Sequence, residues 1–168
     1  LDSDPTAVEG EVWYNASTGK LRMYASEGSW ATGEALPAVM VKNAGAGTQT
    51  AAIVFGGLDA DGVADESYTY DGTNYTDIGA MTNNRQMLGG CGTSTAALGA
   101  CGYTVGDHGT DTEEWDGSSW SETANLGTAR YGGHCAGTQT AALCISGNAY
   151  PNPLKAEVEQ YDGSSWTE

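Results

Sequence analysis

The stretch A-G-T-Q-T-A-A at residues 46–52 decides the fold, because the chain repeats it. C-G-T-S-T-A-A follows at residues 91–97, and A-G-T-Q-T-A-A returns at residues 136–142, so both spacings are 45 residues. Two aromatic positions keep nearly the same period: Tyr70 and Tyr75, Trp115 and Trp120, and Tyr161 and Trp166. Motifs that share one period indicate tandem copies of a structural unit, not a chain folded around one core.

Each copy predicts four short strands. In the third copy they are expected at residues 131–137, 140–145 and 156–161, with a fourth beginning at 165–167. Asp162-Gly163 is typical of a tight hairpin turn, where glycine tolerates a positive φ. The unit is therefore predicted to be a four-stranded antiparallel meander of about 45 residues, which is the form of a β-propeller blade. The fold class predicted for the chain is all-β.

The repeats divide the chain into four parts. Residues 36–80, 81–125 and 126–168 are the three copies, and residues 1–35 are an extended lead-in and a β-hairpin, either an adapter or a partial blade. Three copies are too few for the rings common in propellers, so we expect an incomplete ring in this chain. Either the natural chain is longer or other chains complete the ring.

Residue size fits such an arrangement. Glycine, alanine, threonine and cysteine fill the first two strands of each copy, as expected where strands crowd near a central axis. The recurring tyrosines and tryptophans are expected to pack between neighbouring blades, where a large flat side chain buries much area. The four cysteines form no C-x-x-C pair, and we expect them to be small, buried, free thiols.

Charge and hydropathy exclude two classes of partner. The chain has 6 Lys and Arg against 22 Asp and Glu, a net charge of −16. Nucleic-acid binding needs basic contacts to phosphates, so we expect no nucleic-acid partner. No apolar run reaches the length of a membrane span, so no membrane insertion is expected.

The order of the motifs within a copy identifies a family resemblance. An arginine comes before the first strand, as Arg85 and Arg130, and an apolar strand ends in Gly-Gly, as Gly56-Gly57. An aromatic-Asp pair follows at Tyr70-Asp71, Trp115-Asp116 and Tyr161-Asp162, and then a tryptophan at Trp120 and Trp166. Over residues 36–168 this resembles the Kelch or galactose-oxidase-type propeller repeat. Met40 replaces the arginine in the first copy, and the later Gly-Gly positions read Cys101-Gly102 and Ser146-Gly147.

A narrower resemblance concerns function. A-G-T-Q-T-A-A-L and E-x-Y-D-G-S-S-W-T, with the opening stretch at residues 7–24, resemble segments of virion structural and tail-fibre proteins of marine tailed phages, notably cyanophages. The resemblance implies a non-enzymatic virion component, a fibre, tip or decoration module. Its expected partners are other copies of itself, other virion proteins and a host-surface glycan. The alternatives are a secreted carbohydrate-binding or carbohydrate-active propeller, and a cellular Kelch-type scaffold.

Two loops carry candidate ligand groups. Asp59, Asp61 and Asp65 concentrate carboxylates, and hard oxygen ligands of this kind suit calcium. Their spacing fails the EF-hand pattern, so a solvated acidic loop and no cofactor is the preferred interpretation. Tyr103, Tyr150 and Asn152 are expected in loops after the second strand, where aromatic and amide groups could hold a sugar.

Catalytic motifs give no support for an enzyme. His134 is next to Cys135, but adjacent strand residues point to opposite faces and cannot easily act together. The copper ligands of galactose oxidase cannot be placed with two histidines. We therefore expect no catalytic residues and no enzymatic activity.

Overall fold

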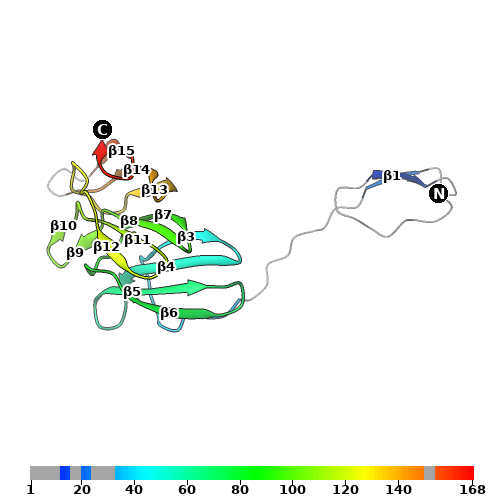
Figure 1. Ribbon diagram of the computed structural model, residues 1–168, viewed down its shortest axis with the longest axis horizontal. Coiled ribbons are helices and arrows are strands. Elements are labelled where there is room, and N and C mark those ends of the chain that lie inside the picture. The colour runs from blue at the N-terminus through cyan, green and yellow to red at the C-terminus, as the bar shows by residue number, and fades with distance from the viewer. Residues whose placement is uncertain (1–11, 16–19, 24–32, 150–153) are drawn as a thin grey trace. The chain divides into compact units, whose positions relative to one another are not determined.

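The computed structural model describes residues 12–15, 20–23, 33–149 and 154–168 (Figure 1). These residues form strands and turns and contain no helix, so the predicted all-β class is confirmed. The chain divides into two compact units, Leu1–Gly33 and Glu34–Glu168. In the first, β1 (Val12–Asn15) pairs with β2 (Lys20–Met23) as an antiparallel hairpin.

The second unit holds three four-stranded antiparallel sheets, each made from consecutive strands of one repeat. Sheet 1 contains β3 (Ala44–Thr48), β4 (Ala51–Leu58), β5 (Val63–Tyr70) and β6 (Tyr75–Ala80). Sheet 2 contains β7 (Gly89–Thr93), β8 (Ala96–Ala100), β11 (Thr112–Trp115) and β12 (Trp120–Glu122). Sheet 3 contains β13 (His134–Thr138), β14 (Ala141–Gly147), β15 (Lys155–Tyr161) and β16 (Trp166–Thr167).

The strands predicted for the third copy are confirmed, with ends that move by a few residues. Each sheet is an antiparallel meander, because its strands lie in the sheet in the same order as along the chain. An additional hairpin, β9 (Tyr103–Thr104) and β10 (Asp107–His108), lies between the second and third strands of sheet 2.

The first strands of the three sheets lie side by side, with β7 in contact with both β3 and β13. Side-chain size is limiting there. A Cβ atom added to Gly89 would stand 2.5 Å from the Cys135 Sγ atom, and one added to Gly90 would stand 3.0 Å from the Ala44 Cβ atom. The expected crowding of small residues in the first strands is therefore confirmed.

The recurring aromatic residues lie between neighbouring sheets, as expected. Trp120 of sheet 2 donates its indole N–H to the Ser67 hydroxyl of sheet 1, at 3.0 Å. Trp166 of sheet 3 donates in the same way to Thr112 of sheet 2, at 3.1 Å. The two tryptophans occupy equivalent positions in the repeat, and so do Ser67 and Thr112, so the same indole–hydroxyl hydrogen bond occurs at both boundaries.

A buried ion pair also occurs in the second and third copies, between the segment that leads into each sheet and the third strand of that sheet. Arg85 pairs with Glu113 at 2.8 Å and Arg130 pairs with Glu159 at 2.7 Å. The four side chains are almost fully buried. The equivalent residues of the first copy are Met40 and Tyr68, so both partners of the pair are replaced there together.

Each pair fastens the chain where it leaves one sheet for the next. The Glu113 carboxylate accepts the backbone N–H groups of Thr82 and Asn83, at 2.6 and 3.2 Å. The Glu159 carboxylate accepts those of Gly127 and Thr128, at 2.7 and 3.2 Å. Because a carboxylate is a strong acceptor for backbone N–H groups, the pair also satisfies donors that the sheets leave unpaired.

A residue with a left-handed backbone recurs at the end of the second strand of each sheet, within β4 and β14 and directly after β8. Gly56 has a φ of 60°, and the equivalent Cys101 and Ser146 have φ values of 56° and 54°. A residue with a Cβ atom costs about 1–2 kcal/mol in this conformation. The family resemblance expected Gly-Gly here, and the structure keeps the backbone conformation although the first glycine is lost.

Ser146→Gly is therefore expected to raise the free energy of unfolding by about 1 kcal/mol, since glycine adopts this φ without strain. Urea denaturation followed by tryptophan fluorescence would measure it. Gly147→Ala is the matched control, because Gly147 has a φ of 126° and an added Cβ would stand 3.0 Å from the Tyr131 carbonyl oxygen. This control should destabilise the protein. A loss of stability in Ser146→Gly would contradict the assignment of strain.

The hairpin turn before the fourth strand is held by one aspartate in every sheet. Asp162 Oδ1 accepts the backbone N–H groups of Ser164 and Ser165, both at 2.8 Å, and Asp71 and Asp116 make the equivalent bonds. The Ser164 hydroxyl, followed by the two backbone N–H groups, lowers the pKa of Asp162 to about 2. Serine and backbone donors also lower the pKa of Asp116.

These pKa shifts predict an acid-sensitive contribution to stability. Because the pKa is lower in the folded than in the unfolded protein, the turns stabilise the fold above the ordinary aspartate pKa of about 4. That contribution is lost as the pH falls through the folded pKa, near 2 for Asp162. A carboxyl-carbon NMR titration should give the low pKa for Asp162, and Ser164→Ala should raise it. An unchanged pKa in Ser164→Ala would contradict the hydroxyl's role.

Candidate binding site

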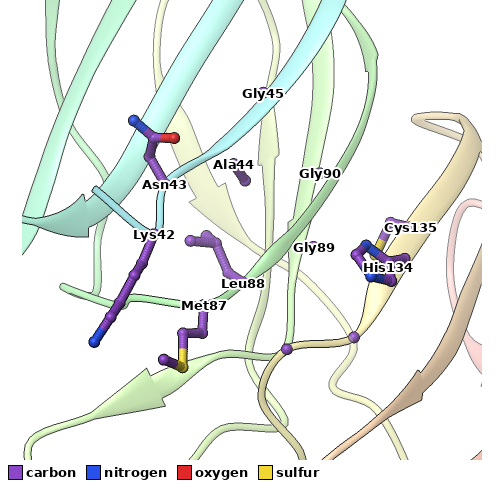
Figure 2. A pocket seen from close by; sticks show the side chains of 12 residues that line it. Lys42, Asn43, Ala44, Gly45, Met87, Leu88, Gly89, Gly90, His134 and Cys135 are labelled. Atoms are coloured by element: carbon purple, nitrogen blue, oxygen red, sulfur yellow. The ribbon is translucent and has the colours of Figure 1, made fainter. Parts of the chain in front are cut away.

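Three equivalent stretches of the repeats line one open cavity of about 380 Å³: residues 42–45, 87–90 and 132–135 (Figure 2). Each stretch is the segment that leads into the first strand of its sheet. The cavity therefore lies where the three sheets meet, and every sheet contributes the same part of its fold. This is the strongest candidate site in the described part of the chain.

Backbone hydrogen bonds connect these stretches across the sheets. The Met87 N–H donates to the Lys42 carbonyl at 2.8 Å, and the Gly132 N–H donates to the Met87 carbonyl at 2.7 Å. These three residues share a left-handed backbone, with φ values of 57°, 55° and 67°. Each copy thus makes the same backbone hydrogen bond to the copy before it. Because the backbone holds the cavity wall in place, the side chains that line it are free to vary.

The cavity wall differs between copies in its side chains. Asn43, Leu88 and Gly133 are equivalent positions, and so are Gly45, Gly90 and Cys135. Lys42 donates its ammonium group to Gln86 Oε1 at 3.1 Å. His134 is exposed. The lining offers mixed polar and apolar contacts with no concentration of acidic groups, in contrast to the overall charge of −16.

A second cavity of about 310 Å³ lies beside the first and involves a residue that the sequence singled out. It is lined by Tyr103 and Tyr131 together with Lys42, Gln86 and Met87. The two tyrosine rings meet edge to face, with centroids 5.9 Å apart. Tyr103 was expected in a loop, and this is corrected: it begins β9, and its N–H and C=O pair with Gln86. The physical reason is that Gly106, with a φ of 95°, allows a tight turn.

The remaining candidate ligand residues are Tyr150, Asn152 and the three aspartates of the acidic loop. Tyr150 and Asn152 lie outside the described residues. Asp59 lies in the β4–β5 turn, where its Oδ1 accepts the N–H groups of Asp61 and Gly62, both at 2.8 Å. Asp65 lies within β5. No group of three or more His, Cys, Asp or Glu residues that could hold a metal ion occurs among the residues the structure describes.

The four cysteines are free, and three of them are buried, which agrees with the expectation for this composition. Cys101 and Cys144 pack in one apolar cluster with Cys135 beside them, where sheet 2 meets sheet 3. Thiol hydrogen bonds from Cys101 and Cys135, together with Arg130, lower the pKa of Cys144. Burial raises the pKa of Cys91 to about 11. Burial makes these thiols part of the packing between sheets.

No residue motif in the sequence indicates either cavity. The lining stretches read K-N-A-G, M-L-G-G and G-G-H-C and share no residue pattern. Their common feature is a position just before the first repeated strand. The available signal was thus the period of the repeat, which places residues 42, 87 and 132 at equivalent points. Within the described ranges, no helix is long and apolar enough to span a membrane.

Comparison with known proteins concerns the fold alone. No protein-family model matches the chain, and none of the curated proteins does. Among solved structures, the one titled "Structure of YjhT" is similar over 93% of this chain with a TM-score of 0.66 and 13% sequence identity. The chain spans 50% of the length of that protein. The arrangement of its sheets is thus an all-β fold that also occurs in a chain about twice as long.

Proposed function

We propose that sheets 1–3 are blades of a β-propeller and that the chain is a non-enzymatic structural module of a tailed-phage virion. It would serve as a fibre, tip or decoration module and present its surface for assembly or for contact with the host envelope. The observation that carries the propeller part is the cavity lined by residues 42–45, 87–90 and 132–135. Equivalent segments meet at one place when repeats are arranged around a common axis.

A display role suits the way the sheets are joined. Backbone hydrogen bonds and indole–hydroxyl contacts join neighbouring sheets, and buried ion pairs hold the segments that lead into sheets 2 and 3. Such an array holds its loops in fixed positions, so variation in the loops changes the surface without changing the frame. The β8–β11 connection illustrates this, since it carries the extra β9–β10 hairpin. The phage assignment itself rests on the resemblance of the repeated segments to virion proteins.

The virion role is tested on particles. Mass spectrometry of phage particles purified from a host lysate by density gradient should find peptides of this chain at a fixed ratio to the major capsid protein. Antibodies against the chain should label one part of the particle in electron micrographs. Absence of the chain from particles that retain infectivity would contradict the virion role and leave the propeller proposal intact.

A second candidate function is carbohydrate binding, favoured by the tyrosine-lined cavity. Tyr103 and Tyr131 line this cavity together with Gln86 and Lys42. Aromatic faces with a few polar groups are the usual means of orienting a small ligand. A glycan array should detect binding that Tyr103→Ala abolishes and that Val105→Ala, a change at an exposed residue of the same connection, retains. No glycan bound by the unaltered chain would contradict this function.

A further inference from the structure

Within the chain, each sheet that is followed by another has one face covered. We call this the forward face: it comprises Ile53, Phe55 and Ser67 in sheet 1, and Leu98, Ala100 and Thr112 in sheet 2. All six residues are 0% exposed. The covering face of the next sheet, its rear face, carries Trp120 in sheet 2 and Trp166 in sheet 3. The same interface between sheets is thus built twice.

The forward face of sheet 3 has the same construction, but no other sheet among the described residues of Glu34–Glu168 covers it. Its residues are Leu143, Ile145 and Val158, which are 38%, 37% and 40% exposed. Leu143 and Ile145 alternate along β14, and Val158 pairs with Ile145 in the sheet register, so the three share one face. They are entirely apolar where sheets 1 and 2 place a hydroxyl group. Exposed apolar residues gathered on a face that is buried elsewhere in the same fold indicate an interaction surface.

The rear face of sheet 1 differs in a matching way. Tyr75 stands where sheets 2 and 3 have the tryptophan, and its ring lies against Tyr70 at 4.7 Å, as Trp166 lies against Tyr161 at 5.0 Å. The rear face of sheet 1 therefore lacks the indole N–H donor. The forward face of sheet 3 lacks the hydroxyl acceptor, because Val158 stands where sheets 1 and 2 have Ser67 and Thr112. The buried Arg–Glu pair is likewise absent on the rear side of sheet 1, where Met40 and Tyr68 stand.

Side-chain volume is matched in the same manner. At the first boundary, Phe55 faces Gly90 and Gly99, where an added Cβ would stand 2.9 Å from its ring atoms. At the second boundary, the small Ala100 packs with Cys144. If sheet 3 packed against sheet 1, Ile145 would face Gly45 and Val54, which are equivalent to Gly90 and Gly99 of sheet 2. This contact would again combine larger and smaller side chains. Close-packed interfaces require such compensation.

We propose that the forward face of sheet 3 binds the rear face of sheet 1 from a second copy of this chain. Each copy then uses both faces, so two copies bury both uncovered faces in a closed arrangement of six sheets. A contact between two different surfaces gives a closed ring only when the rotation that relates successive copies adds up to a full turn. The similar solved structure supports this number, because this chain spans 50% of that one. The inference uses the sheet arrangement and does not rest on a virion role.

The mass of the full chain in solution tests the proposal. Light scattering after size exclusion, and sedimentation equilibrium, should give twice the chain mass. Ile145→Glu should weaken association by about a hundredfold or more, since it buries an unpaired carboxylate. Leu154→Glu is the control, because Leu154 is 78% exposed and lies outside the forward face. Circular dichroism should show that both variants keep their strands.

A pair of substitutions tests which two faces meet. Val158→Thr and Tyr75→Trp together recreate the internal contact between Thr112 and Trp166, and should tighten association by about fivefold, the effect of one hydrogen bond. Neither substitution alone should do so. If the chain is a monomer at all concentrations, the proposal is overturned. That result would hold equally if another part of the chain, or a different protein, covers the forward face of sheet 3. Association without coupling between positions 158 and 75 would overturn it too.

Discussion

Glu113→Gln is expected to lower the free energy of unfolding by about 3–5 kcal/mol, because it leaves the Arg85 guanidinium buried without a counter-ion. Both side chains are 0% exposed and 2.8 Å apart. Arg85 also donates to the carbonyls of Cys101 and Asp111, at 3.1 and 2.6 Å, so it cannot turn toward solvent without breaking further bonds. Urea denaturation of the purified variant measures the loss.

The first repeat suggests how the pair can be replaced as a unit. Arg85→Met and Glu113→Tyr copy Met40 and Tyr68. Each alone should cost several kcal/mol, whereas the double variant should cost less than the sum, because residues in direct contact are not additive. Lys155→Gln is the control: its pair with Glu157 is longer, at 4.0 Å, and partly exposed, so we expect less than about 0.5 kcal/mol. Equal losses in Glu113→Gln and Lys155→Gln would refute the role of burial.

Phe55→Ala is expected to cost about 3–5 kcal/mol, the range for removing a large aromatic side chain from a core. Phe55 is 0% exposed and is the chain's one phenylalanine. Its ring lies 4.8 Å from that of Trp120, at the boundary between sheets 1 and 2. The neighbouring Gly90 and Gly99 cannot fill the space that the ring leaves, so a cavity would remain.

Gly99→Cys distinguishes this packing account from a general loss of apolar area. In the unaltered chain it should destabilise, since a Cβ at Gly99 would stand 2.9 Å from the Phe55 ring. Combined with Phe55→Ala it should recover part of the lost stability, because it copies the Ala100 and Cys144 pairing of the next boundary. Denaturant unfolding of the four variants in the cycle measures the coupling. Additive losses would contradict it.

The sequence predicted the strands well because their signals are local and repeated. Three copies of each turn and aromatic motif made the period clear, and Asp162-Gly163 marked a hairpin that the structure contains. The expected place of Trp120 and Trp166 between sheets was also confirmed. Local turn chemistry and strand alternation survive folding because nothing in the tertiary structure overrides them.

What the sequence did not predict depends on contacts between distant residues. Arg85 was recognised as part of a motif, but its partner Glu113 lies 28 residues away and carries no signal of its own. Asp59 was considered as a calcium ligand, whereas its carboxylate holds its own turn. Five of the twelve residues that line the cavity where the sheets meet are glycines and the others differ from copy to copy, so no residue pattern marks the cavity and only the 45-residue period relates its three stretches.

A crystal structure of the purified full chain would show what covers the forward face of sheet 3. We expect two copies in one closed array of six sheets, with Val158 of each copy beside Tyr75 of the other. Leu143, Ile145 and Val158 facing solvent in every crystal form, with the chain monomeric in solution, would contradict it.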